Sequence, residues 1–286
     1  MDLNLENITF VIVTFESENI IHQCIDSLPK DSPKIVIENS KNINLKKDIE
    51  SKYDNIEVII NENIGMGAAN NIGIKKSMTQ FAFVINPDVK FKEDAVKEII
   101  ESCKLIKDFA IISPINSDPN YPNYKRLNNS KNINENIINV DQVDGFSMLI
   151  NKDKFRDQKF FDENFFLYLE NNDLCLRATK NHQEIYVIKN SIIDHLGASS
   201  VNSKMLKELE YLRNWHWMWS KFYYNKKHYG YFNALNKVAS NFLSAVFKYF
   251  FYLITINTYK NKIYKMRLLG LFNSMIGKKS WYRLKD

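Results

Sequence analysis

The chain has 286 residues, 45% of them hydrophobic and 25% charged, so it can bury a sizeable core and is unlike a disordered protein in composition. Its formal net charge is +6, and the surplus of Lys and Arg gathers toward the C-terminal end among aromatic residues. Because zinc-finger spacing and long arginine-rich segments are absent from the sequence, this charge favours an anionic membrane surface or a phosphorylated ligand over nucleic acid.

Three cysteines, Cys24, Cys103 and Cys175, are widely spaced, and each lies in an apolar pattern of helical type. An odd, scattered set indicates small core residues in a reducing compartment, not a disulfide framework or a metal cluster. The N-terminal stretch MDLNLENITFVIVTF carries acids where a secretory signal peptide needs a basic segment. The expected location is cytoplasmic.

The first part of the chain alternates short apolar strands with helical patterns. Strands are expected at 8–14, 34–38, 56–60 and 83–85, and helices at about 20–28, 45–53 and 68–77. This alternation predicts an α/β protein, with a mostly parallel sheet flanked by helices and a crevice at the carboxyl ends of the strands.

The fourth of these strands ends abruptly on Asn86-Pro87-Asp88. Pro87 cannot donate to a strand ladder, so the strand stops there and holds out the Asp88 carboxylate. Mg²⁺ and Mn²⁺ prefer oxygen ligands, which makes Asp88 a candidate ligand for a metal that neutralises a nucleotide diphosphate. A neutral His195 is the second candidate, since manganese accepts imidazole readily. Taken singly, a turn carboxylate and a core histidine are the alternative explanations.

The stretch NENIGMGAANNIG, residues 61–73, departs from the dinucleotide-binding fingerprint because Asn70 stands where the last glycine is required. It also follows the third expected strand, not the first, so a Rossmann dehydrogenase is disfavoured. Gly65 and Gly67 would let the backbone approach a ligand closely, while Asn63 and Asn70 offer amide groups. An ordinary strand-to-helix turn is the alternative.

The later elements are less regular. We expect a helix at about 93–106, a strand at 109–112, a long loop at 113–139, strand character at 140–150 broken by Asp144-Gly145, a helix near 170–178, and two strands at 185–187 and 192–194. Helical character begins near Lys204. The apolar run 242–256 is too short for a typical spanning helix, so a helix in the membrane interface and a packed helix are both open.

The ordered motifs VIVTFES, VIENS, NENIGMGAANNIG, FAFVINPDV, VDGFSMLI, FDENFFLYLENNDLCLRA and DHLGASS resemble the family 2 inverting glycosyltransferases, especially their bacterial rhamnosyltransferase-like branch. The resemblance covers about residues 8–201. It implies a GT-A fold, a Rossmann-like mixed sheet flanked by helices, over 1–202. The nucleotide-sugar half would be about 1–112 and the acceptor half about 113–202, followed by a helical, basic and aromatic extension at 203–286.

The resemblance also implies the roles of single residues. Asp88 matches the metal-binding carboxylate of the family's degenerate DxD element. Glu38 stands where the family commonly has an Asp that contacts the base or ribose. The residues implied to lie near the nucleotide are Thr14, Glu16, Glu38, Asn63, Gly65, Asn70 and Asp88.

The implied reaction moves a sugar from a UDP-, dTDP- or GDP-sugar, with Mg²⁺ or Mn²⁺, to a hydroxyl of a glycan or lipid-linked oligosaccharide in bacterial surface polysaccharide synthesis. Rhamnose is the sugar suggested by the branch. A lipid-linked acceptor would place the basic extension at the inner face of the cytoplasmic membrane.

The catalytic base is where the sequence departs from the family, whose Glu-Asp-x-Asp run becomes Glu170-Asn171-Asn172-Asp173. An amide cannot take up the acceptor's proton, so Asn171 is excluded. Glu170 is the first candidate and Asp173 the second, although Asp173 is also spaced to pair with Arg177. A catalytically inactive nucleotide-sugar-binding protein is the alternative function. A nucleotidyltransferase is disfavoured because residues 14–17 form no basic glycine-rich loop.

Overall fold

The computed structural model describes residues 3–126, 132–155, 160–197 and 206–283. The chain divides into two compact units. The sheet unit consists of Met1–Asp162 and Glu170–Ser200, and the helical unit of Glu163–Leu169 and Val201–Asp286. The expected boundary at 202–203 lies outside the described residues.

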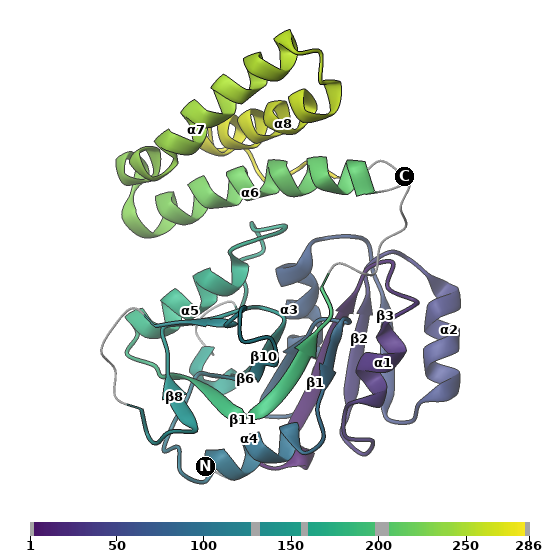
Figure 1. Ribbon diagram of the computed structural model, residues 1–286. Helices are drawn as coiled ribbons and strands as arrows, with labels where there is room; N and C mark the ends of the chain where they lie inside the picture. Colours follow the sequence, from purple (N-terminus) through teal and green to yellow (C-terminus); the bar gives the residue numbers. More distant parts are fainter. Residues whose placement is uncertain (1–2, 127–131, 156–159, 198–205, 284–286) are drawn as a thin grey trace. The chain divides into compact units, whose positions relative to one another are not determined.

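The sheet unit is built on one large mixed sheet (Figure 1). Its strands run in the order β3-β2-β1-β4-β10-β6-β11-β5, and β8 also pairs with β11. The strands are β1 (Ile8–Thr14), β2 (Lys34–Glu38), β3 (Ile56–Ile60), β4 (Phe81–Ile85), β5 (Val89–Phe91), β6 (Ile111–Asn116), β8 (Ile137–Asn139), β10 (Ser147–Asn151) and β11 (Ile185–His195). A separate two-stranded ribbon joins β7 (Tyr124–Lys125) and β9 (Gln142–Val143).

Helices cover both faces of this sheet (Figure 1). They are α1 (Ile21–Asp26), α2 (Ile43–Lys52), α3 (Met66–Lys76), α4 (Ala95–Cys103) and α5 (Glu170–Lys180), with short 3₁₀ helices at Leu5–Asn7 and Lys152–Phe155. Apolar side chains of α1, α2 and α4 join one core cluster, and those of α3 and α5 join the cluster on the opposite face.

The continuous apolar run of β1 follows from this double coverage. Phe10 and Ile12 belong to the first cluster, whereas Val11 belongs to the second. A strand that is buried on both faces needs apolar residues at successive positions, not only at alternate ones. All seven residues of β1 are buried.

The predicted parallel strands β1 to β4 are confirmed, and the three cysteines are free and buried, as expected. Three predictions are wrong. The sheet is not mostly parallel, because β10 pairs antiparallel with β4 and β6, and β11 pairs antiparallel with β5 and β8. The expected loop 113–139 contains the end of β6, all of β7 and all of β8. The two strands expected at 185–187 and 192–194 are one strand, β11, whose pairing with β6 shifts register between Ile188 and Ile192. An irregularity in pairing interrupts the apolar pattern without ending the strand.

The helical unit contains three long helices, α6 (Leu206–Tyr229), α7 (Tyr231–Ile254) and α8 (Thr258–Met275), coloured green to yellow in Figure 1. Gly270 of α8 lies against the backbone of α6, because a Cβ there would be 2.1 Å from the carbonyl oxygen of Trp215. Phe165 packs in the same cluster as Trp215 and Trp219, so this aromatic of the FDENFFLYLENND motif is core of the helical unit. None of the helices in the described part of the chain is both long and apolar enough to cross a bilayer.

Candidate active site

The strand order brings the carboxyl ends of β1 and β4 together. The chain runs from β1 through β2 to β3 on one side, then returns so that β4 pairs with the other side of β1. In open α/β sheets, ligands bind at such a reversal, in the crevice outside the carboxyl ends of the strands. Thr14 ends β1 and Asn86 follows β4, so both lie at this reversal.

A tight turn after β4 sets the position of Asp88. The backbone N–H of Val89 donates to the carbonyl of Asn86 at 3.2 Å, which puts Pro87 and Asp88 at the two central positions of the turn. The chain continues as β5, which pairs antiparallel with β11 so that Val89 lies opposite His195. The end of β4 is therefore a turn that brings Asp88 to the end of β11.

Asp88 and His195 contact each other directly. The Oδ2 atom of Asp88 is 3.3 Å from Nε2 of His195, and the two side chains are 14% and 21% exposed. The ring of Phe146 stacks on the imidazole with centroids 4.1 Å apart and an interplanar angle of 15°. The other carboxylate oxygen of Asp88, Oδ1, is buried and has no hydrogen-bond partner among the described residues.

This donor pair fits a divalent cation. Two ligands at about 2.1 Å on adjacent corners of an octahedron lie about 3 Å apart, close to the separation of Asp88 Oδ2 and His195 Nε2. Within the described ranges, no group of three His, Cys, Asp or Glu residues could hold a metal. A cation at this pair would therefore take its other ligands from a diphosphate and water.

Asp144 lies on the loop between β9 and β10. Burial raises the pKa of its carboxyl, while a hydrogen bond from Tyr121 and the charges of Lys125 and His195 act in the opposite direction. The carboxylate therefore lies within electrostatic reach of His195.

Glu170 is the first residue of α5. Its Oε2 atom is buried and has no hydrogen-bond partner among the described residues. Burial raises the pKa of the Glu170 carboxyl to about 7. The two residues before it, Tyr168 and Leu169, have φ angles of 72° and 68°, an uncommon conformation for residues with side chains. A carboxyl poised near neutrality suits a general base.

Gly67 makes room for Glu170. A Cβ at Gly67 would lie 3.0 Å from Cβ of Phe161 and 3.3 Å from Cβ of Glu170, which is tighter than ordinary contact. Gly73 plays a similar part farther along α3, where a Cβ would be 2.3 Å from a methyl carbon of Val11. Two glycines of the NENIGMGAANNIG stretch thus allow close packing within the protein.

The second candidate base is differently placed. Asp173 is fully buried, and its Oδ2 accepts a 2.9 Å hydrogen bond from Nε of Arg177, whose Nη2 donates to the carbonyl of Phe160. Asn171 donates from Nδ2 to the carbonyl of Val143 at 2.9 Å. The geometry favours Glu170 over Asp173 as the base, since the Asp173 carboxylate is engaged by a cation.

Glu38 lies beside Thr14 in the β1–β2 register, with its carboxylate turned to its own loop. One oxygen accepts from the backbone N–H of Ser40 at 3.1 Å and from its hydroxyl, and the other accepts from the N–H of Asn42 at 2.5 Å. Asn42 caps α2, so Glu38 shapes the loop that enters this helix. Burial raises the pKa of nearby Glu16, and the charges of Glu18 and Glu38 raise it further.

Asparagines at the ends of β2 and β3 form a chain of amides. Nδ2 of Asn61 donates to Asn39 Oδ1, and Nδ2 of Asn39 donates to Asn63 Oδ1, both at 3.3 Å. Asn63 Oδ1 also accepts from the N–H of Gly65, whose φ of 96° favours glycine. Asn39 and Asn61 were missed from the sequence, although each directly follows a strand and could have been found by that position.

Buried side-chain atoms without a hydrogen-bond partner concentrate at the predicted site. Among the described residues there are seven, in Thr14, Asn70, Asp88, Ser147, Glu170, Gln183 and Trp215. Four of these residues were predicted from the sequence to bind the nucleotide or the metal or to act as the base. Because folded proteins pair nearly all buried polar groups, these four residues have side-chain oxygens free to bond a ligand or water.

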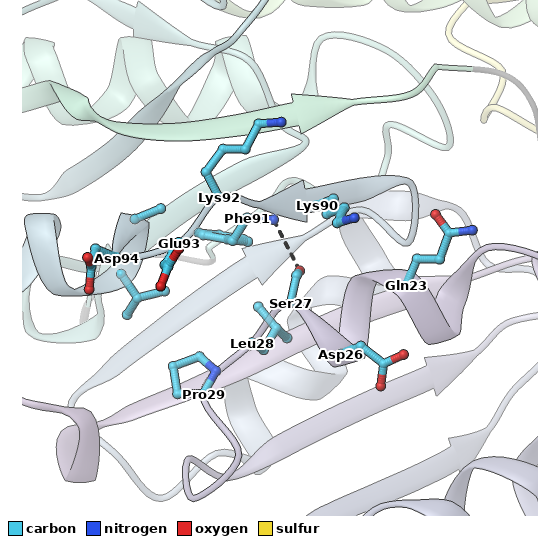
Figure 2. Close-up of a pocket in the computed structure, with 12 residues that line it drawn as sticks. Gln23, Asp26, Ser27, Leu28, Pro29, Lys90, Phe91, Lys92, Glu93 and Asp94 are labelled. Carbon is cyan, nitrogen blue, oxygen red and sulfur yellow. Dashed lines mark hydrogen bonds between the residues drawn. The ribbon is translucent and has the colours of Figure 1, made fainter.

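A separate hollow of about 590 Å³ lies between the end of α1 and the segment from β5 to the start of α4 (Figure 2). Its wall includes Asp26, Lys90, Lys92 and Glu93, and Ser27 accepts a hydrogen bond from the N–H of Phe91 at 3.1 Å. None of the predicted site residues lines it, so this hollow is distinct from the candidate active site.

Two curated relatives are similar to the chain. The low-salt glycan biosynthesis hexosyltransferase Agl10 of Haloferax volcanii is 24% identical in an alignment 200 residues long, which covers 63% of this chain and 64% of Agl10. The rhamnosyltransferase WbbL of Escherichia coli K12 is 25% identical in an alignment 199 residues long, which covers 59% of this chain and 75% of WbbL. The match thus spans less than two thirds of the length of Agl10.

Solved structures share the fold at low identity. The mannosyltransferase PcManGT of Pyrobaculum calidifontis, in complex with GDP-Man and Mn²⁺, has a TM-score of 0.55 at 8% identity, covering 96% of this chain and 88% of that one. Residues 1–349 of S. aureus TarS have a TM-score of 0.52 at 12% identity, covering 97% and 93%.

The sequence model of the family "Glycosyl transferase family 2" matches residues 9–169, which are more than half of the chain. This part of the chain carries β1 to β4 and Asp88. The mixed sheet, its flanking helices and the C-terminal helices agree with the GT-A fold implied by the ordered motifs. The chain therefore belongs to glycosyl transferase family 2.

Proposed function

We propose that the protein is a metal-dependent, inverting glycosyltransferase that moves a sugar from a nucleotide-diphosphate sugar to a hydroxyl of a glycan or lipid-linked acceptor. The observation that carries this proposal is a pair of buried carboxylate oxygens, Asp88 Oδ1 and Glu170 Oε2, that lack hydrogen-bond partners among the described residues. Such a transfer needs one carboxylate at the leaving diphosphate and another at the attacking hydroxyl.

The donor would lie along the carboxyl ends of the strands. The residues proposed to contact or shape the nucleotide site are Thr14, Glu16, Glu38, Asn63, Gly65, Asn70 and Asp88. Thr14 and Asn70 each contribute a buried oxygen that lacks a partner in the described part of the chain. Glu38 would act through the loop that it holds, because both of its oxygens already accept bonds from Ser40 and Asn42.

Asp88 and His195 would hold Mg²⁺ or Mn²⁺, and the charge of that cation would stabilise the departing diphosphate. Stacking of Phe146 keeps the His195 ring beside Asp88. The structure of PcManGT is a complex with GDP-Man and Mn²⁺, which supports a divalent cation in a protein of this fold.

Glu170 would take the proton of the acceptor hydroxyl through Oε2. The hydroxyl oxygen then forms the new bond to the anomeric carbon while the bond to the diphosphate oxygen breaks on the opposite face, as in other oxocarbenium-like displacements. The anomeric configuration inverts, and the enzyme carries no covalent intermediate. A pKa near 7 gives a substantial ionised fraction at neutral pH and retains useful basicity.

The acceptor class follows from the relatives and from the helical unit. WbbL is named as a rhamnosyltransferase and Agl10 as a hexosyltransferase of glycan biosynthesis, which supports rhamnose or another hexose and a surface glycan. A lipid-linked oligosaccharide at the inner face of the cytoplasmic membrane would suit the basic, aromatic helices α6 to α8.

The test is slow hydrolysis of a panel of UDP-, dTDP- and GDP-sugars, with Mn²⁺ or with EDTA. Wild type is expected to release one nucleotide only with metal. Asp88→Ala should abolish release and Glu170→Gln should reduce it sharply, while Asp54→Ala, an exposed acid elsewhere on the unit, should match wild type. Tight metal-dependent nucleotide binding with no release from any donor would replace the proposal with an inactive binding protein.

A further inference from the structure

Helix α7 is apolar on its outward side as well as on its packed side. Its buried residues are Ala234, Val238 and Ala245, which share one face at helical spacing. At 100° per residue, a second set of apolar residues lies on the opposite face. This outer stripe consists of Phe232, Leu243, Phe247, Phe250 and Ile254, with exposed fractions of 84%, 66%, 70%, 55% and 79%.

The outer stripe is unusual for a surface helix. An amphipathic helix packed on a protein core normally turns polar residues to water, whereas a helix that is apolar on all sides is normally covered on all sides. Four of its five residues lie between Leu243 and Ile254, a section that extends about 17 Å at a rise of about 1.5 Å per residue. Large apolar side chains gathered on an exposed helical face in this way mark an interaction site.

The charge of the helical unit identifies what covers the stripe. Residues 206–283 contain eleven Lys and three Arg but only two acids, Glu208 and Glu210, a net charge of +12. From residue 211 to 285 the sequence contains no Asp or Glu. The remainder of the chain is therefore net acidic, because the whole carries +6. Basic residues concentrated around an exposed apolar helix complement an anionic lipid surface.

Lysines of α7 and α8 accompany the stripe. Lys237 and Lys248 lie on α7 and are exposed. The Nζ atom of Lys248 is 5.4 Å from the ring centroid of Tyr264, and that of Lys260 is 5.2 Å from the ring of Tyr252. Long lysine stems beside aromatic rings can extend their ammonium groups to lipid phosphates while the apolar side chains enter the interface.

A second copy of the chain suits the stripe less well. Pairing two outer stripes would bring together two units of charge +12, and like charges across an interface oppose association. We propose that α7 lies in the surface of an anionic bilayer, with Phe232, Leu243, Phe247, Phe250 and Ile254 inserted among the acyl chains at the headgroup boundary. This membrane contact is independent of the transfer chemistry.

The test is flotation of the full chain with vesicles made of equal parts phosphatidylglycerol and phosphatidylcholine, or of phosphatidylcholine alone. Wild type is expected to float with the anionic vesicles and much less with the neutral ones. The pair Leu243→Glu and Phe247→Glu should weaken binding on the order of a hundredfold, since two large apolar side chains are removed from the interface.

The matched control is Asn233→Glu with Ser244→Glu, which makes the same charge change at two exposed positions of the same helix that point about 80° and 100° away from the centre of the stripe. Binding retained by this control and lost by the Leu243 and Phe247 pair supports the proposal, provided that circular dichroism shows equal helicity. Wild type that remains in solution with anionic vesicles overturns it. The proposal is also overturned if the wild type forms a concentration-dependent dimer that the Leu243→Glu and Phe247→Glu variant does not form, because the stripe would then be a protein interface.

Donor hydrolysis in vesicle-free buffer separates this proposal from the transferase proposal. A Leu243 and Phe247 variant that hydrolyses donor normally but no longer floats supports membrane contact alone. A wild-type protein that floats with the vesicles but hydrolyses no donor would contradict only the transferase proposal.

Discussion

The carboxylate of Asp88 faces the imidazole of His195 at 3.3 Å, although one follows β4 and the other ends β11. The contact exists because the turn at Asn86–Val89 leads into β5, which pairs antiparallel with β11. It joins an oxygen donor and a nitrogen donor at the edge where the carboxyl ends of β1 and β4 meet. In the proposed metal site, a cation would need both side chains in these positions.

Replacing Asp88 by Asn should remove most metal-dependent affinity for a nucleoside diphosphate. The variant preserves the size of the side chain but loses the charge that a hard cation prefers. Calorimetric titration of UDP, dTDP or GDP with Mn²⁺ should show affinity reduced by at least about tenfold, as for the loss of groups that support metal ligands. Binding in EDTA should be unchanged, and Asp54→Asn should resemble wild type. Equal affinity in Asp88→Asn would remove Asp88 from the metal site.

The sequence predicted β1 to β4 well because each is a short apolar run bounded by turn residues. It did not reveal β5, because three residues after Asn86-Pro87-Asp88 are too few to show a period. The strand exists only because β11, far away in the chain, offers its edge. The role of Glu38 could not be predicted either. Its carboxylate accepts hydrogen bonds from the backbone N–H groups of Ser40 and Asn42, and a sequence does not show backbone hydrogen bonds of this kind.

Glu170 illustrates the same limit at the candidate base. The sequence named it only by its place beside Asn171, whereas the raised pKa arises from burial, which depends on tertiary structure. The partner of Asp173 could be predicted, because Arg177 lies four residues away on the same helical face. Local spacing is visible in a sequence, but desolvation is not.

Donor hydrolysis by wild type should rise with pH through about 7, because the Glu170 carboxyl must be ionised to accept a proton. The Glu170→Gln variant should hydrolyse donor slowly, and its rate should not rise with pH through about 7. The measurement is the hydrolysis rate from pH 5.5 to 8.5 at saturating donor and metal. A wild-type profile that is flat across this range would show that Glu170 is not the base.

The ionisation of Glu170 should make the protein less stable as pH rises, whereas it makes donor hydrolysis faster. The pKa of the Glu170 carboxyl in the folded state lies above its ordinary value of 4.5, so between pH 4.5 and about 7 the folded state binds more protons than the unfolded state. The free energy of unfolding therefore falls as pH rises through this window. Glu170→Gln, which cannot ionise, should be more stable than wild type at pH 8 by roughly 1 to 3 kcal/mol. Urea unfolding at pH 5 and pH 8 measures the difference.

Asn171→Asp restores the acid that related enzymes carry, but it should not raise activity. The Asn171 amide donates to the carbonyl of Val143 at 2.9 Å, and a carboxylate there would oppose that oxygen. Gly145 also lies close, since a Cβ on it would be 3.1 Å from Cβ of Asn171. We expect a loss of about 1 to 3 kcal/mol in unfolding free energy and no gain in donor hydrolysis. Faster turnover would instead assign the base to position 171.

The helical unit should lose stability as pH falls below about 6.5, because His216 is buried in a neutral form. It is fully buried, with Nε2 2.8 Å from the carbonyl oxygen of Tyr282 and Nδ1 2.9 Å from the hydroxyl of Ser280. Nε2 carries the hydrogen and donates to Tyr282, so Nδ1 accepts from Ser280. Burial lowers the pKa of His216 to about 3, from its ordinary value of 6.5.

The sign of the effect follows from proton uptake. Above pH 6.5 both states are neutral at this position, whereas between pH 6.5 and 3 only the unfolded state binds the proton. The unfolding free energy should therefore decline by up to about 1.4 kcal/mol per pH unit over this range from His216 alone.

All four tryptophans, Trp215, Trp217, Trp219 and Trp281, lie in the helical unit, so tryptophan fluorescence during urea unfolding reports on this unit. His216→Phe should be less stable than wild type at pH 7.5, having lost two hydrogen bonds, but should show a flatter pH dependence. His182→Gln, in the sheet unit, should keep the wild-type slope, and an unchanged slope in His216→Phe would exclude His216 as its source.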